Sequence, residues 1–178
     1  MKQYDQSAYQ TAEDGENRNL PAGGYIAQIT SAIDFPDKEY IKLEFEIMDG
    51  EWQGYAAQTY QRAKFWPLRG VRSYKEAARA FFNGFLKAVT ESNPGFAWDW
   101  NERSLVKKAI GIVIGEREYV GNDGTVKVGI EISQIRSVQA IRDGKFKVPA
   151  RKPLSEADKA KVSTTAAACE GADDDLPF

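Results

Sequence analysis

The amino-acid sequence predicts a mainly β domain with one helix, an α+β fold, over residues 21–148. Four segments carry apolar residues at every second position, the periodicity of a strand with one buried face. Between the third and fourth expected strands, the apolar spacing changes to that of a helix. The chain has 178 residues, of which 42% are hydrophobic and 28% charged. This composition suits one globular domain with tails.

The first strand follows a turn at residues 20–24 and is interrupted at residues 34–38. Its expected buried face consists of Tyr25, Ala27, Ile29 and Ile33. The second strand has the clearest alternation, with Ile41, Leu43, Phe45 and Ile47 between polar neighbours. One face of this strand is therefore expected to be buried and the other solvated. Asp49 and Gly50 form the next turn, and a third strand is expected over residues 53–60.

A helix is expected after residue 73. Ser73 is a suitable N-cap and Glu76 stands three residues later, which is the spacing of a capping box. Apolar residues follow at helical spacing: Ala77, Ala78, Phe81, Phe82, Phe85, Leu86 and Val89. The helix should end by Asn93, because Pro94 and Gly95 cannot continue it.

Two more strands complete the pattern. One face of the fourth strand carries Ile110, Ile112 and Ile114, and a hairpin turn follows at residues 121–124. One face of the fifth strand carries Val126, Val128, Ile130 and Ile132. A short strand pair is expected around Asp143 and Gly144. The elements therefore follow the order of an OB-fold, which is a five-stranded Greek-key barrel with a helix between strands three and four. A small α+β sheet covered by one helix has the same order, so both architectures stay open.

Both ends of the chain differ in composition from the body. Residues 1–20 are polar and are expected to form a mobile, disordered arm, and residues 149–178 have no apolar periodicity and are expected to be a flexible linker with an acidic tip. The tip consists of Asp173, Asp174, Asp175, Leu176, Pro177 and Phe178. It suits a hook for a partner protein, in which the Phe178 ring fills an apolar pocket while the carboxylates meet a basic rim. A solvated acidic tail is the alternative.

The composition argues against several classes of site. The chain has no histidine and a single cysteine, Cys169, so a zinc site, an internal disulfide and a nucleophile activated by histidine are not expected. Glycine-rich nucleotide motifs are absent, and neither a cofactor nor an enzymatic activity is expected. No apolar run approaches the ~20 residues of a membrane span, and a cytoplasmic location is expected. Glu116 and Glu118 could bind Mg²⁺ as in a nuclease, or form the solvated face of a strand.

The formal net charge of −2 hides a separation along the chain. Residues 21–152 carry 20 basic and 16 acidic side chains, whereas residues 153–178 carry 2 basic and 6 acidic ones. A basic body with an acidic tail is typical of a nucleic-acid binder whose tail competes for the basic surface.

Residues 60–72 contain four cations, three aromatic residues and no acid. Proteins that bind single strands combine these two components, because cations meet phosphates and bases stack on rings. The predicted DNA-binding residues are Trp52, Tyr55, Tyr60, Arg62, Lys64, Phe65, Trp66, Arg69, Arg72 and Lys127. The two tryptophans, Tyr55 and Phe65 could instead be core residues.

Other candidates are weaker. Arg117 could also reach a phosphate, and the basic stretch Arg142, Lys145, Lys147, Arg151 and Lys152 could follow the DNA backbone or be a solvated linker. Trp98 and Trp100 are expected to pack against the helix. Glu44 and Glu46 argue against the outer face of the second strand as a DNA surface, since carboxylates repel phosphate.

Two resemblances support this interpretation. The tip resembles the acidic tip of bacterial single-stranded DNA-binding proteins, and the body is similar to a family of phage-encoded proteins assigned to the same function. The body's resemblance depends on residues 20–25, residues 43–54 and the helix at 81–89. The resemblance of the body implies an OB-fold and sequence-tolerant binding of single-stranded DNA. The resemblance of the tip implies recruitment of replication, recombination and repair proteins. The opening strand pattern of the cellular bacterial proteins is absent, so their tetramer is not carried over, although a homo-oligomer stays possible.

Three functions therefore remain at this stage. The first is a phage-type single-stranded DNA-binding protein that works in the host cytoplasm. The second is a protein-interaction module that mimics the host tail without binding DNA. The third is a metal-dependent nuclease.

Overall fold

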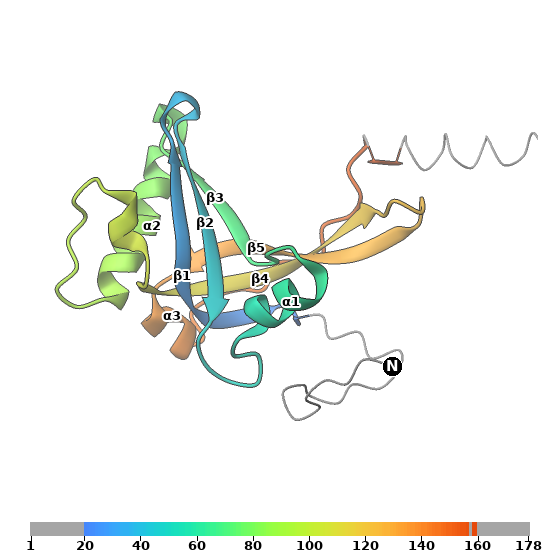
Figure 1. Cartoon of the computed structure of the whole chain (residues 1–178), viewed down its shortest axis with the longest axis horizontal. Helices are drawn as coiled ribbons and strands as arrows, with labels where there is room; N and C mark the ends of the chain where they lie inside the picture. The colour runs from blue at the N-terminus through green and yellow to red at the C-terminus, as the bar shows by residue number, and fades with distance from the viewer. Residues whose placement is uncertain (1–19, 157, 160–178) are drawn as a thin grey trace, which may run out of the picture.

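A computed structural model describes residues 20–156, 158 and 159 of the chain. Its five strands form one antiparallel open sheet in the order β3-β2-β1-β4-β5 (Figure 1). The strands are β1 (Gly23–Phe35), β2 (Tyr40–Ile47), β3 (Arg69–Ser73), β4 (Ala109–Val120) and β5 (Val126–Arg136). The α-helices are α1 (Tyr55–Ala63), α2 (Arg79–Ser92) and α3 (Val138–Arg142). The mainly β architecture is confirmed, whereas the prediction of one helix is wrong.

β1 is the centre of the sheet, because it pairs with two strands over different parts of its length. Residues 23–28 pair with β4, and residues 27–35 pair with β2. A bulge at Thr30 follows the Ile29 to Phe45 pair and reverses the alternation of faces. Ile29 is therefore buried, whereas Ile33, predicted on the same face, is 48% exposed.

The core lies between the inner face of the sheet and α2. The predicted alternating residues of β2 and β4 are buried: Ile41, Leu43, Phe45, Ile47, Ile110, Ile112 and Ile114. α2 adds Phe82, Phe85, Ala88 and Val89, which follow one side of the helix. Each large side chain buried in this way contributes about 1.5–3 kcal/mol. Leu20 is also buried, so the body begins within the segment predicted to be an arm.

α2 ends where the sequence predicts, at Ser92. Asn93 caps it and ties it to the sheet, because its side-chain amide donates to the carbonyls of Val89 and Ala109 at 2.7 and 2.8 Å. Its side-chain oxygen also accepts a hydrogen bond from the Ala109 backbone N–H at 2.9 Å. One residue therefore joins the end of α2 to the start of β4.

The start of α2 differs from the prediction. Ser73 is the last residue of β3, where it pairs with Tyr40, and its hydroxyl donates to the Glu39 carbonyl at 3.1 Å. A 3-10 turn, η3 (Glu76–Ala78), precedes the α-helix. The capping box is therefore wrong, because pairing within the sheet extends to Ser73.

The predicted third strand at residues 53–60 is also wrong, since these residues form α1 and the turn before it. Gly54 has a φ of 77°, a left-handed conformation that glycine adopts without strain. The Glu46 carboxylate then accepts hydrogen bonds from the backbone N–H groups of Ala56 and Ala57 at 2.9 and 2.7 Å. A carboxylate at this position stabilises the positive end of a helix. The third strand forms instead at residues 69–73, within the segment predicted to be a loop.

The outer halves of β4 and β5 project from the rest of the sheet as a two-stranded arm (Figure 1). The predicted hairpin turn at residues 121–124 is confirmed, and the Gly121 N–H donates to the Thr125 carbonyl at 2.8 Å. Val126 and Val128 are exposed rather than buried, because the described residues place no second layer over this end of the arm.

The segment after β5 forms α3, so the strand pair predicted around Asp143 is wrong. Ser137 caps this short helix through a hydrogen bond from the Ala140 N–H. α3 and the residues after it cover the outer side of β4, which explains why Val113 is buried although it faces away from the core. A Cβ atom added at Gly111 would collide with Ile141, so this close packing needs a glycine.

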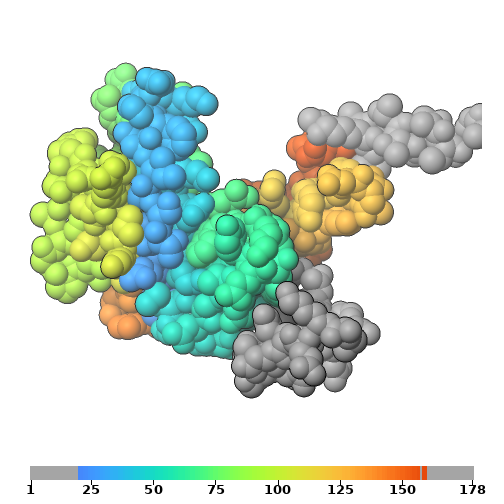
Figure 2. All heavy atoms as spheres, viewed as in Figure 1, coloured from blue at the N-terminus to red at the C-terminus, as the bar shows by residue number. Residues whose placement is uncertain are grey.

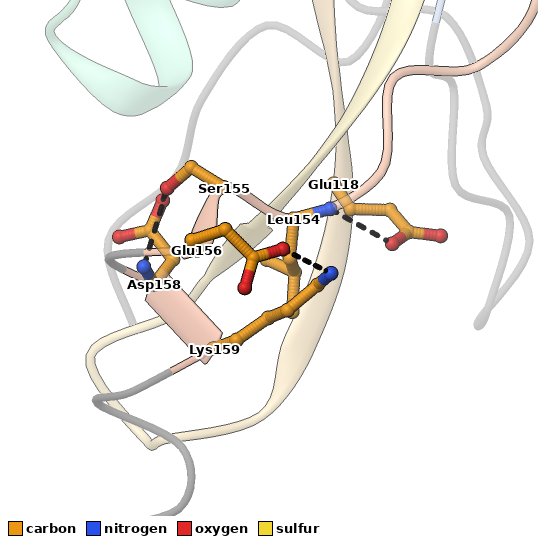
Figure 3. Close-up of polar contacts among 6 residues, drawn as sticks. All are labelled: Glu118, Leu154, Ser155, Glu156, Asp158 and Lys159. Carbon is orange, nitrogen blue, oxygen red and sulfur yellow. Dashed lines mark hydrogen bonds and ion pairs between the residues drawn. The ribbon is translucent and has the colours of Figure 1, made fainter.

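The predicted linker begins too early, because its first residues run along β4. The Lys152 N–H donates to the Glu116 carbonyl at 2.9 Å, and the Glu118 N–H donates to the Lys152 carbonyl at 2.8 Å. Figure 3 shows the Leu154 N–H donating to the Glu118 carboxylate and a short turn that follows, closed by Ser155 with Asp158 and by Glu156 with Lys159. The folded body therefore continues beyond residue 148.

Candidate nucleic-acid interface

The solvent-facing side of β1, β2 and β3 presents a regular ladder of side chains, here called the outer face. Residues directly opposite each other in paired strands point to the same side of a sheet. Three cross-strand rows follow from the register: Ser31, Glu44 and Arg69; Ile33, Lys42 and Val71; and Phe35, Tyr40 and Ser73. The outer face therefore combines two aromatic rings, two aliphatic side chains, two cations and one acid.

The aromatic pair of the outer face is Phe35 and Tyr40, which stack with ring centroids 4.9 Å apart at an interplanar angle of 26°. Beside them, Ile33 and Val71 are 48% and 52% exposed. Tyr40, Lys42, Arg69 and Val71 line a shallow groove of about 330 Å³ along the two strands. Phe35 and Tyr40 are themselves half-buried. Accessible rings next to cations are the components from which single-strand binding surfaces are built.

The acids of β2 do not prevent this use of the face. Glu46, which the sequence analysis counted against the surface, turns toward α1 and accepts backbone hydrogen bonds there. Glu44 stays on the outer face, with its carboxylate 3.7 Å from the Lys42 ammonium and Arg69 directly opposite on β3. The two cations outnumber the single acid, so the outer face carries a net positive charge.

Glu46 should matter for folding rather than for binding. We expect Glu46→Ala to lower the free energy of unfolding by about 1–2 kcal/mol, because the N–H groups at the start of α1 lose their acceptor. Urea denaturation measures the loss. Glu44→Ala is the matched control on the same strand, and the half-buried ion pair of Glu44 with Lys42 should contribute less than about 1 kcal/mol. Equal losses in the two variants would show that α1 does not depend on Glu46.

The segment from α1 to β3 runs alongside β2 at Phe45. The Phe45 N–H donates to the Leu68 carbonyl at 3.0 Å, and the Trp66 indole N–H donates to the Phe45 carbonyl at 2.9 Å. Arg62, Lys64 and Phe65 lie immediately before this contact and are exposed. Figure 2 shows the α1 region, in green, at the surface at the foot of the blue column formed by the β1–β2 hairpin.

The predicted aromatic residues divide into exposed and packed groups. Tyr60 and Phe65 are 49% and 50% exposed, which suits stacking. Trp52, Tyr55 and Trp66 are partly buried and pack against the core. The Trp66 ring also lies 6.0 Å from that of Tyr60, so Trp66 supports the segment that presents Tyr60 and Phe65.

The two predicted arginines of β3 are separated by the pleat of the strand. Arg69 is on the outer face, whereas Arg72 is partly buried in a cavity of about 460 Å³ between β3, β5 and α2. Burial lowers the pKa of Arg72. The same cavity contains Arg136 and the exposed ring of Phe81. Arg72 therefore does not belong to the outer face.

Lys127 lies on the β4–β5 arm, where it pairs with Asp123 at 2.8 Å. Hydrogen bonds from the Lys127 ammonium and from Thr125 hold the pKa of Asp123 below its usual range, and the bond to Asp123 raises the pKa of Lys127. An exposed pair of this kind opens at little cost, but Lys127 is far along the chain from the outer face and the structure does not bring the two together.

Glu116 and Glu118, the two carboxylates considered for a metal site, bind the segment at residues 151–154. The Arg151 Nε–H donates to the Glu116 carboxylate at 2.8 Å, and Nη2 of the same guanidinium forms an ion pair with that oxygen at 2.8 Å. The Glu118 carboxylate accepts a hydrogen bond from the Leu154 N–H. Lys152 pairs with Glu131. Arg151 and Lys152, predicted as part of a basic stretch, therefore fasten the C-terminal segment to β4 and β5.

The aromatic pair of the outer face is not among the site residues predicted from the sequence. Phe35 and Tyr40 flank the turn between β1 and β2, which contains the short helix η2 (Pro36–Lys38). The detectable signal was an aromatic residue on each side of a tight turn, since such residues face each other in a hairpin. The Thr30 bulge concealed it, because the uninterrupted alternation placed Ile33 in the core.

No protein-family model matches the chain, and no curated protein matches it. Within residues 20–156, 158 and 159, no helix is long and apolar enough to cross a membrane, and no group of three or more Cys, Asp or Glu side chains is placed to hold a metal ion. The six tip residues, Asp173 to Phe178 in the sequence, lie outside the described part of the chain.

Proposed function

We propose that the protein binds single-stranded DNA without strong sequence preference, through the outer face and the adjoining α1–β3 segment. The observation that carries the proposal is the cross-strand cluster of Phe35, Tyr40, Lys42 and Arg69, with its groove of about 330 Å³. Stacking on such rings contributes about 1–3 kcal/mol per base and tolerates any base, while the cations contact phosphates.

The sheet supports an OB-type architecture as part of this proposal. β1 is bent at a bulge and pairs with both β2 and β4, and α2 lies between β3 and β4 in the chain. Closing the barrel would require β3 and β5 to meet, and these two edge strands approach each other at Gly70 and Ile132. OB-folds commonly bind oligonucleotides on the face of strands two and three, where the outer face lies.

Single strands fit the outer face better than duplex DNA. Its rings and aliphatic side chains can contact only bases that are not paired within a helix. The rest of the face offers two cations rather than the many that bind a duplex through its backbone. We also propose that the acidic tip recruits proteins of replication, recombination or repair to the bound strand, an assignment that depends on the sequence of the tip alone.

The affinity for single-stranded DNA should fall as salt rises. Each phosphate that the protein neutralises is expected to contribute about −0.7 to the slope of log affinity against log salt. Fluorescence anisotropy with a labelled oligothymidine at several salt concentrations measures the slope. Lys42→Gln and Arg69→Gln should each reduce it by about one such increment.

A matched duplex is the control for this experiment. Affinity that does not change with salt would contradict the electrostatic contribution. Duplex affinity equal to that for the single strand would contradict stacking on the outer face.

A further inference from the structure

We propose that an acidic pocket on the inner side of the sheet, across from the outer face, binds an arginine or lysine side chain of a basic partner protein. The pocket has a volume of about 200 Å³ and lies between β1, β2, the start of α2 and the loop after α2. Its walls consist of four aromatic residues, two carboxylates and one aliphatic residue: Tyr74, Phe82, Trp98, Trp100, Asp34, Glu102 and Ile41. No lysine or arginine of the described residues lines it.

The surroundings of the pocket are negative. The Tyr74 hydroxyl donates to the Asp34 carboxylate at 3.0 Å. Burial, this hydrogen bond and the negative charges of Asp34, Glu39 and Asp37 together raise the pKa of Tyr74. Acids from the β1–β2 turn therefore add to the two carboxylates in the wall, and a bound cation would be attracted from several sides. Among the described residues, the one cation that pairs with a wall carboxylate is the exposed Arg103, whose Nε lies 4.0 Å from the Glu102 carboxylate.

Trp100 is the most informative residue of the pocket. It is 85% exposed, and its backbone has a φ of 62°, a conformation that costs a bulky residue strain. The ring lies 6.4 Å from that of Trp98. Because Trp100 buries little surface, its position adds little to folding. An exposed tryptophan held beside a pocket is the usual anchor of a binding site.

Hydrogen bonds hold the Trp100 loop in this strained shape. The Asp99 carboxylate accepts from the Asn101 N–H at 3.1 Å and from the Ser104 hydroxyl at 2.8 Å, and these bonds lower the pKa of Asp99. The Asn101 side chain caps the short helix η4 (Glu102–Leu105) by accepting from the Arg103 N–H. The indole is thus presented in advance, which reduces the entropy lost when a ligand binds.

The chemistry of the walls selects a cation. The faces of indole and phenyl rings attract an ammonium or guanidinium, and the effect is strongest for tryptophan. The carboxylates add ion pairs, and they repel the phosphates of DNA. The volume accommodates one long side chain rather than a folded element. In Figure 2 the residues around this loop, coloured yellow-green, protrude beside the β1–β2 column, where a partner can reach them. The inference stands independently of the proposed DNA binding.

The test uses the full-length protein labelled with ¹⁵N and the tripeptide acetyl-Gly-Arg-Gly-amide. The chain has four tryptophans, and their indole N–H signals report on two regions at once. We expect saturable shifts of the Trp98 and Trp100 signals at millimolar peptide, with Trp52 and Trp66 unchanged. The citrulline peptide, which has the same shape without the charge, should bind about fivefold more weakly or worse.

Variants separate the pocket from a general effect of charge. Trp100→Ala and the double variant Asp34→Asn with Glu102→Gln should each weaken arginine binding about fivefold or more. Glu76→Gln, an exposed acid on η3 outside the pocket, is the matched control and should bind as the wild type does. The overall spectrum shows whether each variant is folded. If Trp100→Ala alone unfolds the protein, Trp100→Leu keeps the bulk of the side chain and should show the same loss.

Three results would overturn the inference. One is the absence of shifts at Trp98 and Trp100 in the folded wild type, and another is equal binding of the citrulline peptide. The third is a loss of oligonucleotide affinity in Trp100→Ala, which would assign the pocket to the path of a nucleic acid instead.

Discussion

Replacing Tyr40 with alanine is expected to weaken the binding of a single-stranded oligonucleotide by about 1–3 kcal/mol, roughly 5- to 150-fold. Tyr40 is central to the outer face because it stacks with Phe35 and lines the groove with Lys42 and Arg69. Its removal takes away one ring and leaves the other without its stacked neighbour. Anisotropy titration of a labelled oligonucleotide at constant salt measures the change in affinity.

Two variants make the Tyr40 result specific. Tyr40→Phe keeps the ring and should bind nearly as the wild type does. Tyr119→Ala removes a ring from the β4–β5 arm, where Tyr119 covers Gly129, and should leave the affinity unchanged. A thermal melt of each variant confirms that it is folded. If Tyr40→Ala binds as well as the wild type, or if Tyr119→Ala loses as much, the outer face is not the DNA surface.

Deletion of the six tip residues is expected to abolish recruitment of partner proteins while the body stays folded. The tip carries Asp173, Asp174 and Asp175 before Leu176, Pro177 and Phe178, and the proposed hook needs both ring and charges. Phe178→Ala alone should therefore lose most of the affinity for the partner. The deletion should also strengthen DNA binding modestly at low salt, because it removes a tethered acidic competitor for the basic surface.

A pull-down of partner proteins with the full-length and the truncated chain measures recruitment. The full-length and truncated chains are also titrated with DNA. A variant with the six tip residues in scrambled order keeps the charge and tests whether their order matters. The gain in DNA affinity should disappear at high salt, where screening weakens the competition. Recruitment of the same partners by the truncated protein would contradict the role of the tip.

Local pattern was enough for much of the scaffold. The alternation of Ile41, Leu43, Phe45 and Ile47 predicted β2 and its buried face, because a strand with one dry side must repeat every two residues. The helical spacing before Asn93 predicted α2, and the turn at residues 121–124 predicted the β4–β5 hairpin. These features depend on neighbours within a few positions along the chain.

The candidate site was predicted only in part. The cations and exposed rings at Tyr60, Arg62, Lys64 and Phe65 follow from the composition of one segment, and the structure places them beside β2. Phe35 and Tyr40 were missed because a strand assumed to be regular places every second residue on one face, and the Thr30 bulge shifts that assignment by one position.

The mainly β class, the strongly alternating strands and the end of α2 follow from local sequence, since these features depend on periodicity and on breakers such as Pro94. Where segments far apart in the chain meet depends on tertiary packing. The Glu46 carboxylate accepts a hydrogen bond from the first turn of α1, ten residues later in the chain. The backbone of Lys152 pairs with β4, more than thirty residues earlier. The pleat separates Arg69 from Arg72, and the Trp100 loop comes to lie beside Asp34. Such contacts form because each isolated segment leaves backbone groups or apolar faces unsatisfied, and the packing that satisfies them leaves no periodic signal in the sequence.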